Sequence, residues 1–118
     1  MLKLNHKNLE VWNESLILVK QIYLLKEQLP KEEKYGLVSQ INRASVSIIS
    51  NLSEGSARSS KLERKRFYEI ARASLVEIDS QIEILIALNF LSKENILDIE
   101  PQFNKVFAML SNLIKSLR

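Results

Sequence analysis

Two adjacent stretches decide the fold: residues 37–53, LVSQINRASVSIISNLS, and residues 58–90, RSSKLERKRFYEIARASLVEIDSQIEILIALNF. In the first stretch Arg43 is the only ionised side chain, whereas an ordinary surface helix has a charged back opposite its apolar stripe. At helical pitch, this stretch therefore predicts a helix that is covered on more than one face. The second stretch is amphipathic and begins with a run of cations. Together they predict a helical protein that assembles with further copies or partners.

The composition is typical of one folded domain, residues 1–118, with 46% hydrophobic and 26% charged residues. Two glycines and two prolines leave little of the chain for irregular loops. Because cysteine is absent, disulfides and thiolate metal sites are excluded. No run approaches the roughly 20 apolar residues of a membrane span, and the first residues lack the apolar core of a signal peptide. We therefore expect a cytoplasmic protein.

Apolar periodicity and punctuation residues predict the first two helices. The first begins after Asn8 as N-cap and ends near Gln28, because Pro30 stops it. The second lies between Gly36 and Gly55, which serve as its boundaries. The apolar face of the first helix consists of residues at three- and four-residue steps: Leu9, Trp12, Leu16, Val19 and Tyr23.

Two further helices are predicted in the second half of the chain. Ser60 and Glu63 form a capping box for the third, whose buried positions are Phe67, Ala71, Leu75, Ile78, Ile82 and Leu85. Ser92 caps a fourth segment, which Pro101 interrupts with a kink or turn before the main helix. That main helix carries an apolar stripe of Phe103, Val106, Leu110, Leu113 and Leu117. Four helices with short connectors predict an all-α, up-down-up-down four-helix bundle.

A family resemblance enters at the second and third helices. Its motif reads Gln40-x-x-Arg43-Ala44, Ser47-Ile48-x-x-Asn51-x-x-Glu54-Gly55 and, after a basic stretch, Ser74-Leu75-x-Glu77. This pattern, together with LEVWNESLILVKQIY before it, closely resembles the bacterial four-helix-bundle family named after the 23S rRNA intervening-sequence protein. That family also includes the accessory variability protein (Avd) of diversity-generating retroelements, and the likeness spans nearly the whole chain.

The resemblance implies a homopentamer whose subunits form a tapered barrel. For the retroelement branch, it implies a nucleic-acid-binding partner of a reverse transcriptase. No feature of the chain assigns it to one branch, so both stay open.

The residues of the chain argue against an enzyme. The only histidine is His6, near a terminus, and no Glu-x-x-His pair of a di-iron bundle is present. Glu77, Asp79 and Glu83 are close in sequence but point in differing directions around a helix, so they predict no metal cage. A glycine-rich phosphate loop is also absent. We expect no catalysis, no metal and no cofactor.

A polar stripe on the second helix has two interpretations. Its residues are three or four apart and share one face: Gln40, Arg43, Ser47, Asn51 and Glu54. They form either a hydrogen-bonded network between helices or subunits, or the lining of a ligand or nucleic-acid groove. In an antiparallel hairpin turning near Ala57, Glu54 would lie level with Lys61, Asn51 with Arg64, and Arg43 with Arg72 and Ser74. Glu77 would then be the acid that pairs with Arg43.

The start of the third helix is the best functional candidate. Between residues 56 and 72, two anions, Glu63 and Glu69, face six cations: Arg58, Lys61, Arg64, Lys65, Arg66 and Arg72. Cations near a helix N-terminus are unfavourable by about 0.3–1 kcal/mol each when exposed, unless an anion completes the site. This cluster is therefore either a phosphate site or a solvated charged face.

The sequence favours a non-catalytic helical oligomer that binds nucleic acid as an accessory factor. The alternative is a protein-interaction scaffold, for example for a reverse transcriptase, without direct nucleic-acid binding.

Overall fold

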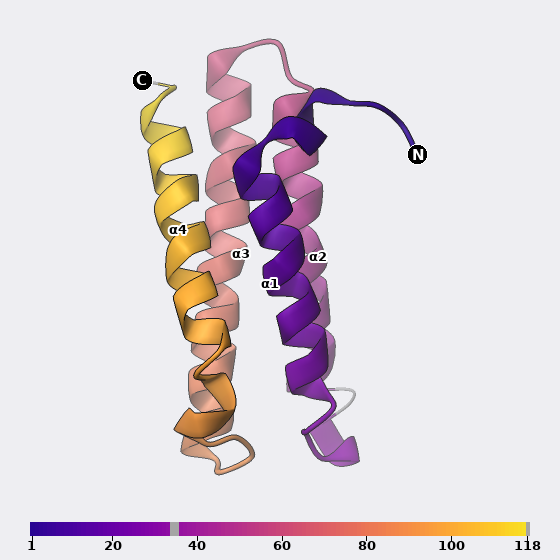
Figure 1. Cartoon of the computed structure of the whole chain (residues 1–118), viewed down its shortest axis with the longest axis vertical. Coiled ribbons are helices and arrows are strands. Elements are labelled where there is room, and N and C mark those ends of the chain that lie inside the picture. Colours follow the sequence, from indigo (N-terminus) through magenta and orange to yellow (C-terminus); the bar gives the residue numbers. More distant parts are fainter. Residues whose placement is uncertain (34–35, 118) are drawn as a thin grey trace.

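The computed structural model describes residues 1–33 and 36–117 and consists of four antiparallel helices (Figure 1). These are α1 (Glu10–Lys26), α2 (Leu37–Ser56), α3 (Lys61–Ala87) and α4 (Ile99–Lys115). Three short 3-10 helices lie before and between them: η1 (Asn5–Asn8), η2 (Lys31–Glu33) and η3 (Lys93–Ile96). The described residues contain no strand, which confirms the all-α prediction. None of the described helices is long and apolar enough to cross a membrane.

The helices follow one another around the bundle, so that α1 contacts α2 and α4, and α3 contacts the same two. This order places α1 diagonal to α3. The turn between α2 and α3 lies at the same end as both chain termini (Figure 1). The core runs through the centre and includes, among fully buried large side chains, Leu18, Ile48, Leu52, Ile78, Leu85 and Leu110.

The predicted core positions of α3 are confirmed apart from Phe67, which is only partly buried. The predicted face of α1 is confirmed at its start, where the partly buried Leu9 and Trp12 pack against the core, and is wrong beyond it. Leu16 and Val19 are only partly buried, and Tyr23 is exposed. The buried side chains of α1 are instead Val11, Ser15, Leu18, Ile22 and Leu25. Apolar residues occur nearly all around α1, so periodicity allows two overlapping faces. Ser15 can lie in the core because its hydroxyl donates to the Val11 carbonyl oxygen at 2.7 Å.

Two predicted helix boundaries are also wrong. Asn8 ends η1 and does not cap α1, whose N-cap is Leu9 without a side-chain cap. Helix α4 begins before Pro101, at Ile99, because a proline in the first turn removes an N–H that has no partner within the helix. Ser92 caps η3, and the predicted Ser60 cap accepts a hydrogen bond from the Glu63 N–H at 3.1 Å.

Helix α2 has an open side in the single chain, so the predicted cover on a further face would have to come from another chain. Arg43, Val46, Ser50 and Glu54 are exposed, whereas Ile49 is partly buried. The open side thus combines two charged residues, Arg43 and Glu54, with the apolar Val46 and the small polar Ser50. That another chain covers this side stays a prediction.

Gly55 lies inside the last turn of α2, where the prediction placed it beyond the helix end. It is buried, and a Cβ atom on it would lie 2.7 Å from a ring carbon of Tyr68 and 3.0 Å from the Cβ of Phe67. Tyr68 is itself 4% exposed, so its ring has little room to move. Glycine is therefore required here for the close approach of α3.

We predict that Gly55→Ala destabilises the protein. Alanine gains about 0.5–1 kcal/mol of helix propensity, but overpacking a buried contact costs about 1–3 kcal/mol. The net loss in the free energy of unfolding is about 1 kcal/mol, measured by urea denaturation. Ser50→Ala on the open side of α2 has no such contact and is the control. A Gly55→Ala protein that is more stable than the parent would contradict the close approach.

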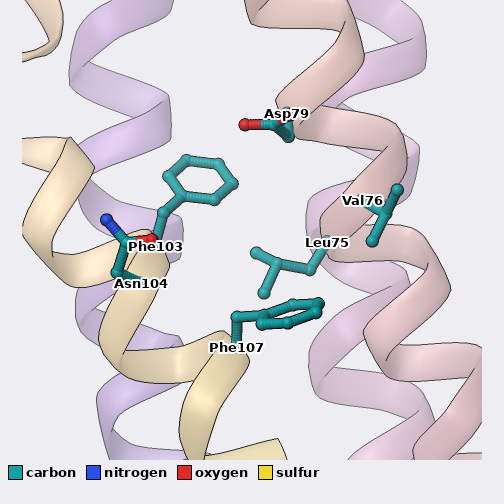
Figure 2. Close-up of a pocket in the computed structure, with 6 residues that line it drawn as sticks. All are labelled: Leu75, Val76, Asp79, Phe103, Asn104 and Phe107. Carbon is teal, nitrogen blue, oxygen red and sulfur yellow. The ribbon is translucent and has the colours of Figure 1, made fainter. Parts of the chain in front are cut away.

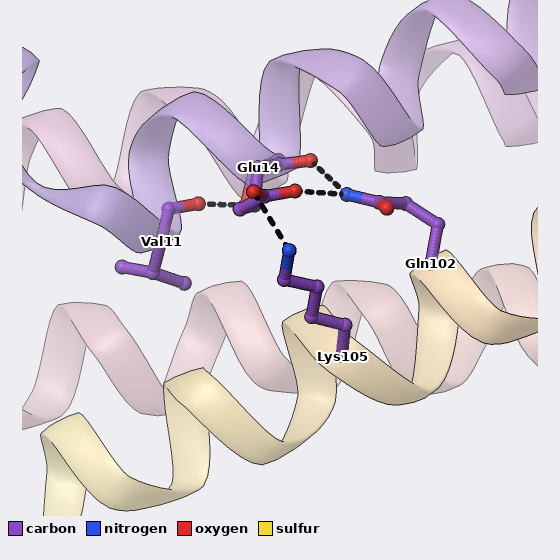
Figure 3. A network of polar contacts seen from close by, with 5 residues as sticks. Val11, Glu14, Gln102 and Lys105 are labelled. Carbon is purple, nitrogen blue, oxygen red and sulfur yellow. Dashed lines mark hydrogen bonds and ion pairs between the residues drawn. The ribbon is translucent and has the colours of Figure 1, made fainter.

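Helices α1 and α4 are joined by a polar cluster around Glu14 (Figure 3). Lys105 Nζ lies 2.9 Å from Glu14 Oε1, and Gln102 Nε2 donates to Glu14 Oε2 at 2.7 Å and to the Glu14 carbonyl oxygen at 2.9 Å. The hydrogen bonds from Gln102 and Lys105 lower the pKa of Glu14 below its ordinary value of 4.5. The ionised carboxylate therefore stabilises the contact between the first and last helices.

This cluster predicts acid-dependent stability. Because the folded pKa of Glu14 is lowered, its contribution is present above pH 4.5 and is lost as the pH falls through the lowered value. Glu14→Gln should unfold at lower urea concentration than the parent at pH 7, and the difference should shrink towards pH 3. Glu94→Gln, at an exposed position in η3, is the matched control. A difference that is independent of pH would show that the charge of Glu14 plays no part.

Candidate functional site

The positive charge of the chain is concentrated at the end of the bundle that holds the α2–α3 turn. Residues 1–17, 47–73 and 108–117 form this half and carry nine lysines and arginines against five acidic residues. The remaining described residues carry six against nine. The net charge of +3 for the whole chain is therefore the sum of a basic end and an acidic end of the bundle.

Three of the predicted cations lie along one side of α3. Lys61, Lys65 and Arg72 are spaced by four and seven residues, which keeps them on one helical face. This face is turned towards α4, because Arg72 Nη1 donates to Ser111 Oγ at 3.2 Å. Lys115, one turn beyond Ser111, is exposed on the same side of α4. We call Lys61, Lys65, Arg72 and Lys115 the basic face.

The other three predicted cations lie elsewhere. Arg58 pairs with Glu54 at 3.1 Å and lies over the ring of Phe67, with 4.8 Å from its Cζ to the ring centre. Arg64 is partly buried, and its Nε atom is buried without a hydrogen-bond partner among the described residues. Arg66 is exposed on the outer side of α3. The six cations of the sequence therefore do not form one surface.

Members of the predicted polar stripe bond across the α2–α3 contact. Ser47 Oγ lies 2.8 Å from Ser74 Oγ and accepts from Asn51 Nδ2 at 2.9 Å. Further along, Gln81 Nε2 donates to Gln40 Oε1 at 3.4 Å and to Glu77 Oε1 at 3.2 Å. Ser74 and Gln81, which complete these contacts, are buried polar residues of α3.

The predicted register between α2 and α3, which sets the residues that lie opposite each other, is wrong. It would place Tyr68 opposite Ser47, but Ser74 lies there. As a result Glu54 contacts Arg58 and not Lys61. Arg43 is exposed, and no ion pair joins it to Glu77, whose carboxylate accepts from Gln81 instead. Within residues 1–33 and 36–117 the ion pairs are Glu54–Arg58 and Glu14–Lys105.

No group of three or more His, Cys, Asp or Glu side chains in the described part of the chain is arranged to hold a metal ion. His6 packs against the ring of Trp12, with the ring centres 5.1 Å apart. The Trp12 indole N–H in turn donates to Ser53 Oγ at 3.2 Å. These contacts tie the start of the chain to α2.

Comparison with known proteins gives the family. The model of the family described as 23S rRNA-intervening sequence protein matches residues 7–112. This chain belongs to that family. The match includes all of α1, α2 and α3, so Lys61, Lys65 and Arg72 of the basic face lie within it, together with Ser111 of α4.

A solved structure supports the fold. It is a protein of unknown function from the S23 ribosomal protein family of Bacteroides thetaiotaomicron VPI-5482. The TM-score is 0.79 at 24% sequence identity, and the similarity covers 89% of this chain and 95% of the other. A search of the curated proteins gave no match.

Sequence reasoning missed two parts of this site. Lys115 and Ser111 come from α4, far from the basic run in sequence, and only the packing of α4 on α3 brings them together. The alignment of Lys61, Lys65 and Arg72 could have been read from their spacing. The resulting surface holds three amines and a guanidinium beside a helix N-terminus, a set that suits phosphate groups.

Proposed function

We propose that this protein is a non-catalytic, oligomeric accessory factor of the cytoplasm that binds nucleic acid through the basic face. The observation that carries the proposal is that Lys61, Lys65, Arg72 and Lys115 lie together without an ion pair among the described residues. Arg72 is held in place by Ser111, and Lys61 is the first residue of α3. A polyanion would supply the missing negative charge.

The geometry favours phosphate over a single carboxylate. The three positions on α3 extend over 11 residues, which is about 16 Å along the helix axis and longer than one small anion. Consecutive phosphates of a nucleic-acid strand repeat along such a length. The family name refers to an intervening sequence of 23S rRNA, which makes RNA the preferred polyanion.

One chain at +3 would bind weakly, but assembly would repeat the basic face. We propose a homopentamer, the number that the family resemblance implies. A ring of five requires two different surfaces on each subunit, because a self-complementary contact closes after two copies. Linked patches on one strand gain affinity through their effective concentration.

Two exposed apolar surfaces on opposite sides of the bundle are suited to such a ring. On α3, Leu62, Ile70 and Ile84 expose 43–71% of their surfaces. On the diagonal helix α1, exposed fractions of 45–64% are found for Ile17, Tyr23 and Leu24. Surfaces of this kind mark interaction sites more often than solvent-facing helix backs.

The same surfaces favour the alternative function. If they contact a different protein, for example a reverse transcriptase, the chain would be a scaffold that does not itself bind nucleic acid. The basic face would then be a solvated surface.

We predict that Lys61→Glu, Lys65→Glu and Lys115→Glu together abolish binding of a fluorescein-labelled single-stranded RNA. For the parent, the logarithm of affinity should fall linearly with the logarithm of salt concentration, by about 0.7 per phosphate neutralised on a single strand. Few aromatic side chains are exposed at this end, so sequence preference should be slight. Fluorescence anisotropy measures the salt dependence of the affinity and, with RNAs of different sequence, the sequence preference.

The control for this experiment is Lys31→Glu, Arg43→Glu and Lys93→Glu, which changes the net charge equally. These three cations are exposed and lie outside the basic end and both apolar surfaces. The control variant should keep most of the affinity and nearly all of the salt slope. If the basic-face variant binds RNA as tightly as the parent, the scaffold function is favoured.

We predict that the ring is broken from either side. Ile70→Lys with Ile84→Lys should disrupt the α3 surface, and Ile17→Lys with Leu24→Lys the α1 surface. Each variant alone should sediment as the 13.6 kDa chain. An equimolar mixture should form one-to-one heterodimers, because each variant retains the surface that the other lacks.

Other outcomes separate the alternatives. The variant with the disrupted α1 surface retains only the α3 surface. If this variant forms homodimers, the α3 surface binds itself, and a ring of five is excluded. A parent protein that sediments as a monomer at micromolar concentration would rule out self-assembly.

A further inference from the structure

The groove between α3 and α4 changes sign along its length. At the end near the α2–α3 turn, it is flanked by the basic face. At the other end, it is lined by the carboxylates of Asp79, Glu83 and Glu100. These three acids form no ion pair among the described residues. Sequence reasoning took Asp79 and Glu83 to point in differing directions, but their four-residue spacing places both in this groove.

The acidic part of the groove contains an aromatic pocket (Figure 2). The rings of Phe103 and Phe107 project from α4 towards α3, and the Asp79 carboxylate extends from α3 towards α4. Leu75, Val76 and Asn104 complete the lining, and the cavity volume is about 260 Å³. Phe107 is 43% exposed and Val76 50% exposed, so this pocket presents apolar surface to its surroundings.

A second, smaller cavity continues the groove away from the basic face. It has a volume of about 120 Å³, shares Asp79, Phe103 and Asn104 with the first, and adds Glu83 and Glu100. No lysine or arginine lines either cavity. The nearest cation along α3 is Arg72, whose guanidinium is engaged by Ser111. Three carboxylates without a cation among the lining residues favour a cationic group over the phosphates of a nucleic acid in this part.

We propose that this groove binds a basic amphipathic segment of a partner protein, with an arginine between Phe103 and Phe107 and against Asp79. A planar guanidinium stacks on aromatic faces and pairs with a carboxylate in a fixed geometry, whereas a strongly hydrated ammonium does neither as well. The Asn104 side chain adds an amide oxygen that can accept from the same guanidinium.

The two cavities set the spacing of the bound segment. Asp79 and Glu83 are one helical turn apart, about 6 Å along α3. Cations at positions i and i+4 of a partner helix have the same separation, so a second one would reach Glu83 and Glu100. Apolar residues on the same face of that helix would cover Val76 and Phe107. This contact lies outside the basic face and would operate beside the proposed nucleic-acid binding.

The probe for this proposal is a labelled, alanine-based helical peptide of about 16 residues, with leucine and arginine at four-residue spacing. It should bind the full chain, and Asp79→Asn should weaken the affinity about tenfold, the effect of removing a charge-assisted pair. Phe107→Leu should weaken it as well. Asp98→Asn, which removes an exposed acid outside both cavities, should leave it unchanged.

Matched peptides test the chemistry of the occupant. A citrulline peptide keeps the shape but lacks the charge and should not bind, and a lysine peptide should bind severalfold more weakly than the arginine peptide. Equal affinity for the lysine peptide, or equal affinity of Asp79→Asn and the parent, would overturn the proposal. So would displacement of the peptide by spermidine at the peptide's own concentration, which would identify a polyamine site.

Two further measurements separate this site from the proposed function. The Lys61→Glu, Lys65→Glu, Lys115→Glu variant should bind the arginine peptide as the parent does, even where it no longer binds RNA. Sedimentation of Asp79→Asn should give the parent's mass. A reduced mass together with no peptide binding would show that the groove holds a second copy of this chain, and the partner-segment proposal would fail.

Discussion

The arrangement of the basic end depends on the approach of Tyr68 to Gly55. The ring of Tyr68 occupies the space that any side chain at residue 55 would need, and its hydroxyl lies 3.1 Å from Ser56 Oγ. The Ser47–Ser74 hydrogen bond fixes the same register further along. Successive residues of a helix are rotated by about 100°. A slip of one residue would therefore turn Lys61 and Lys65 away from α4 and separate them from Lys115.

This contact also explains why the register could not be predicted. A glycine near the end of a predicted helix serves either to end it or to admit a close neighbour, and the sequence does not distinguish the two uses. Taking Gly55 as the end moved the turn towards α2 and placed Glu54 beside Lys61. In the structure α2 continues to Ser56, and Glu54 lies one turn before Arg58, with which it pairs. The error in one boundary thus changed the expected partner of each charged residue around the turn.

Helices α1 and α3 show where apolar periodicity predicts the buried face and where it does not. In α3 the apolar residues at core spacing form one continuous face, and Ala71, Leu75, Ile78, Ile82 and Leu85 are buried as predicted. In α1 the run Leu16–Val19 is apolar without interruption, and two faces fit the pattern equally well. Contacts with α2 and α4 select the face of Leu18 and Ile22 and leave Tyr23 and Leu24 exposed. The four-helix fold is the same whichever face of α1 is buried, but the residues that α1 exposes depend on that face.

The two ends of the α3–α4 groove carry opposite charges, so ligands bound at the two ends would interact. Arg72 and Asp79 are seven residues apart, about 10 Å along α3, which is close to the Debye length at 0.1 M salt. A phosphate at Arg72 and a guanidinium at Asp79 would therefore attract each other weakly across the groove at physiological salt, and more strongly at lower salt. Because coupling between two binding sites is reciprocal, each ligand would raise the affinity for the other by the same factor. A bundle with both signs on one groove is thus suited to holding a basic protein segment next to a nucleic acid, whereas a uniformly basic surface would repel the segment.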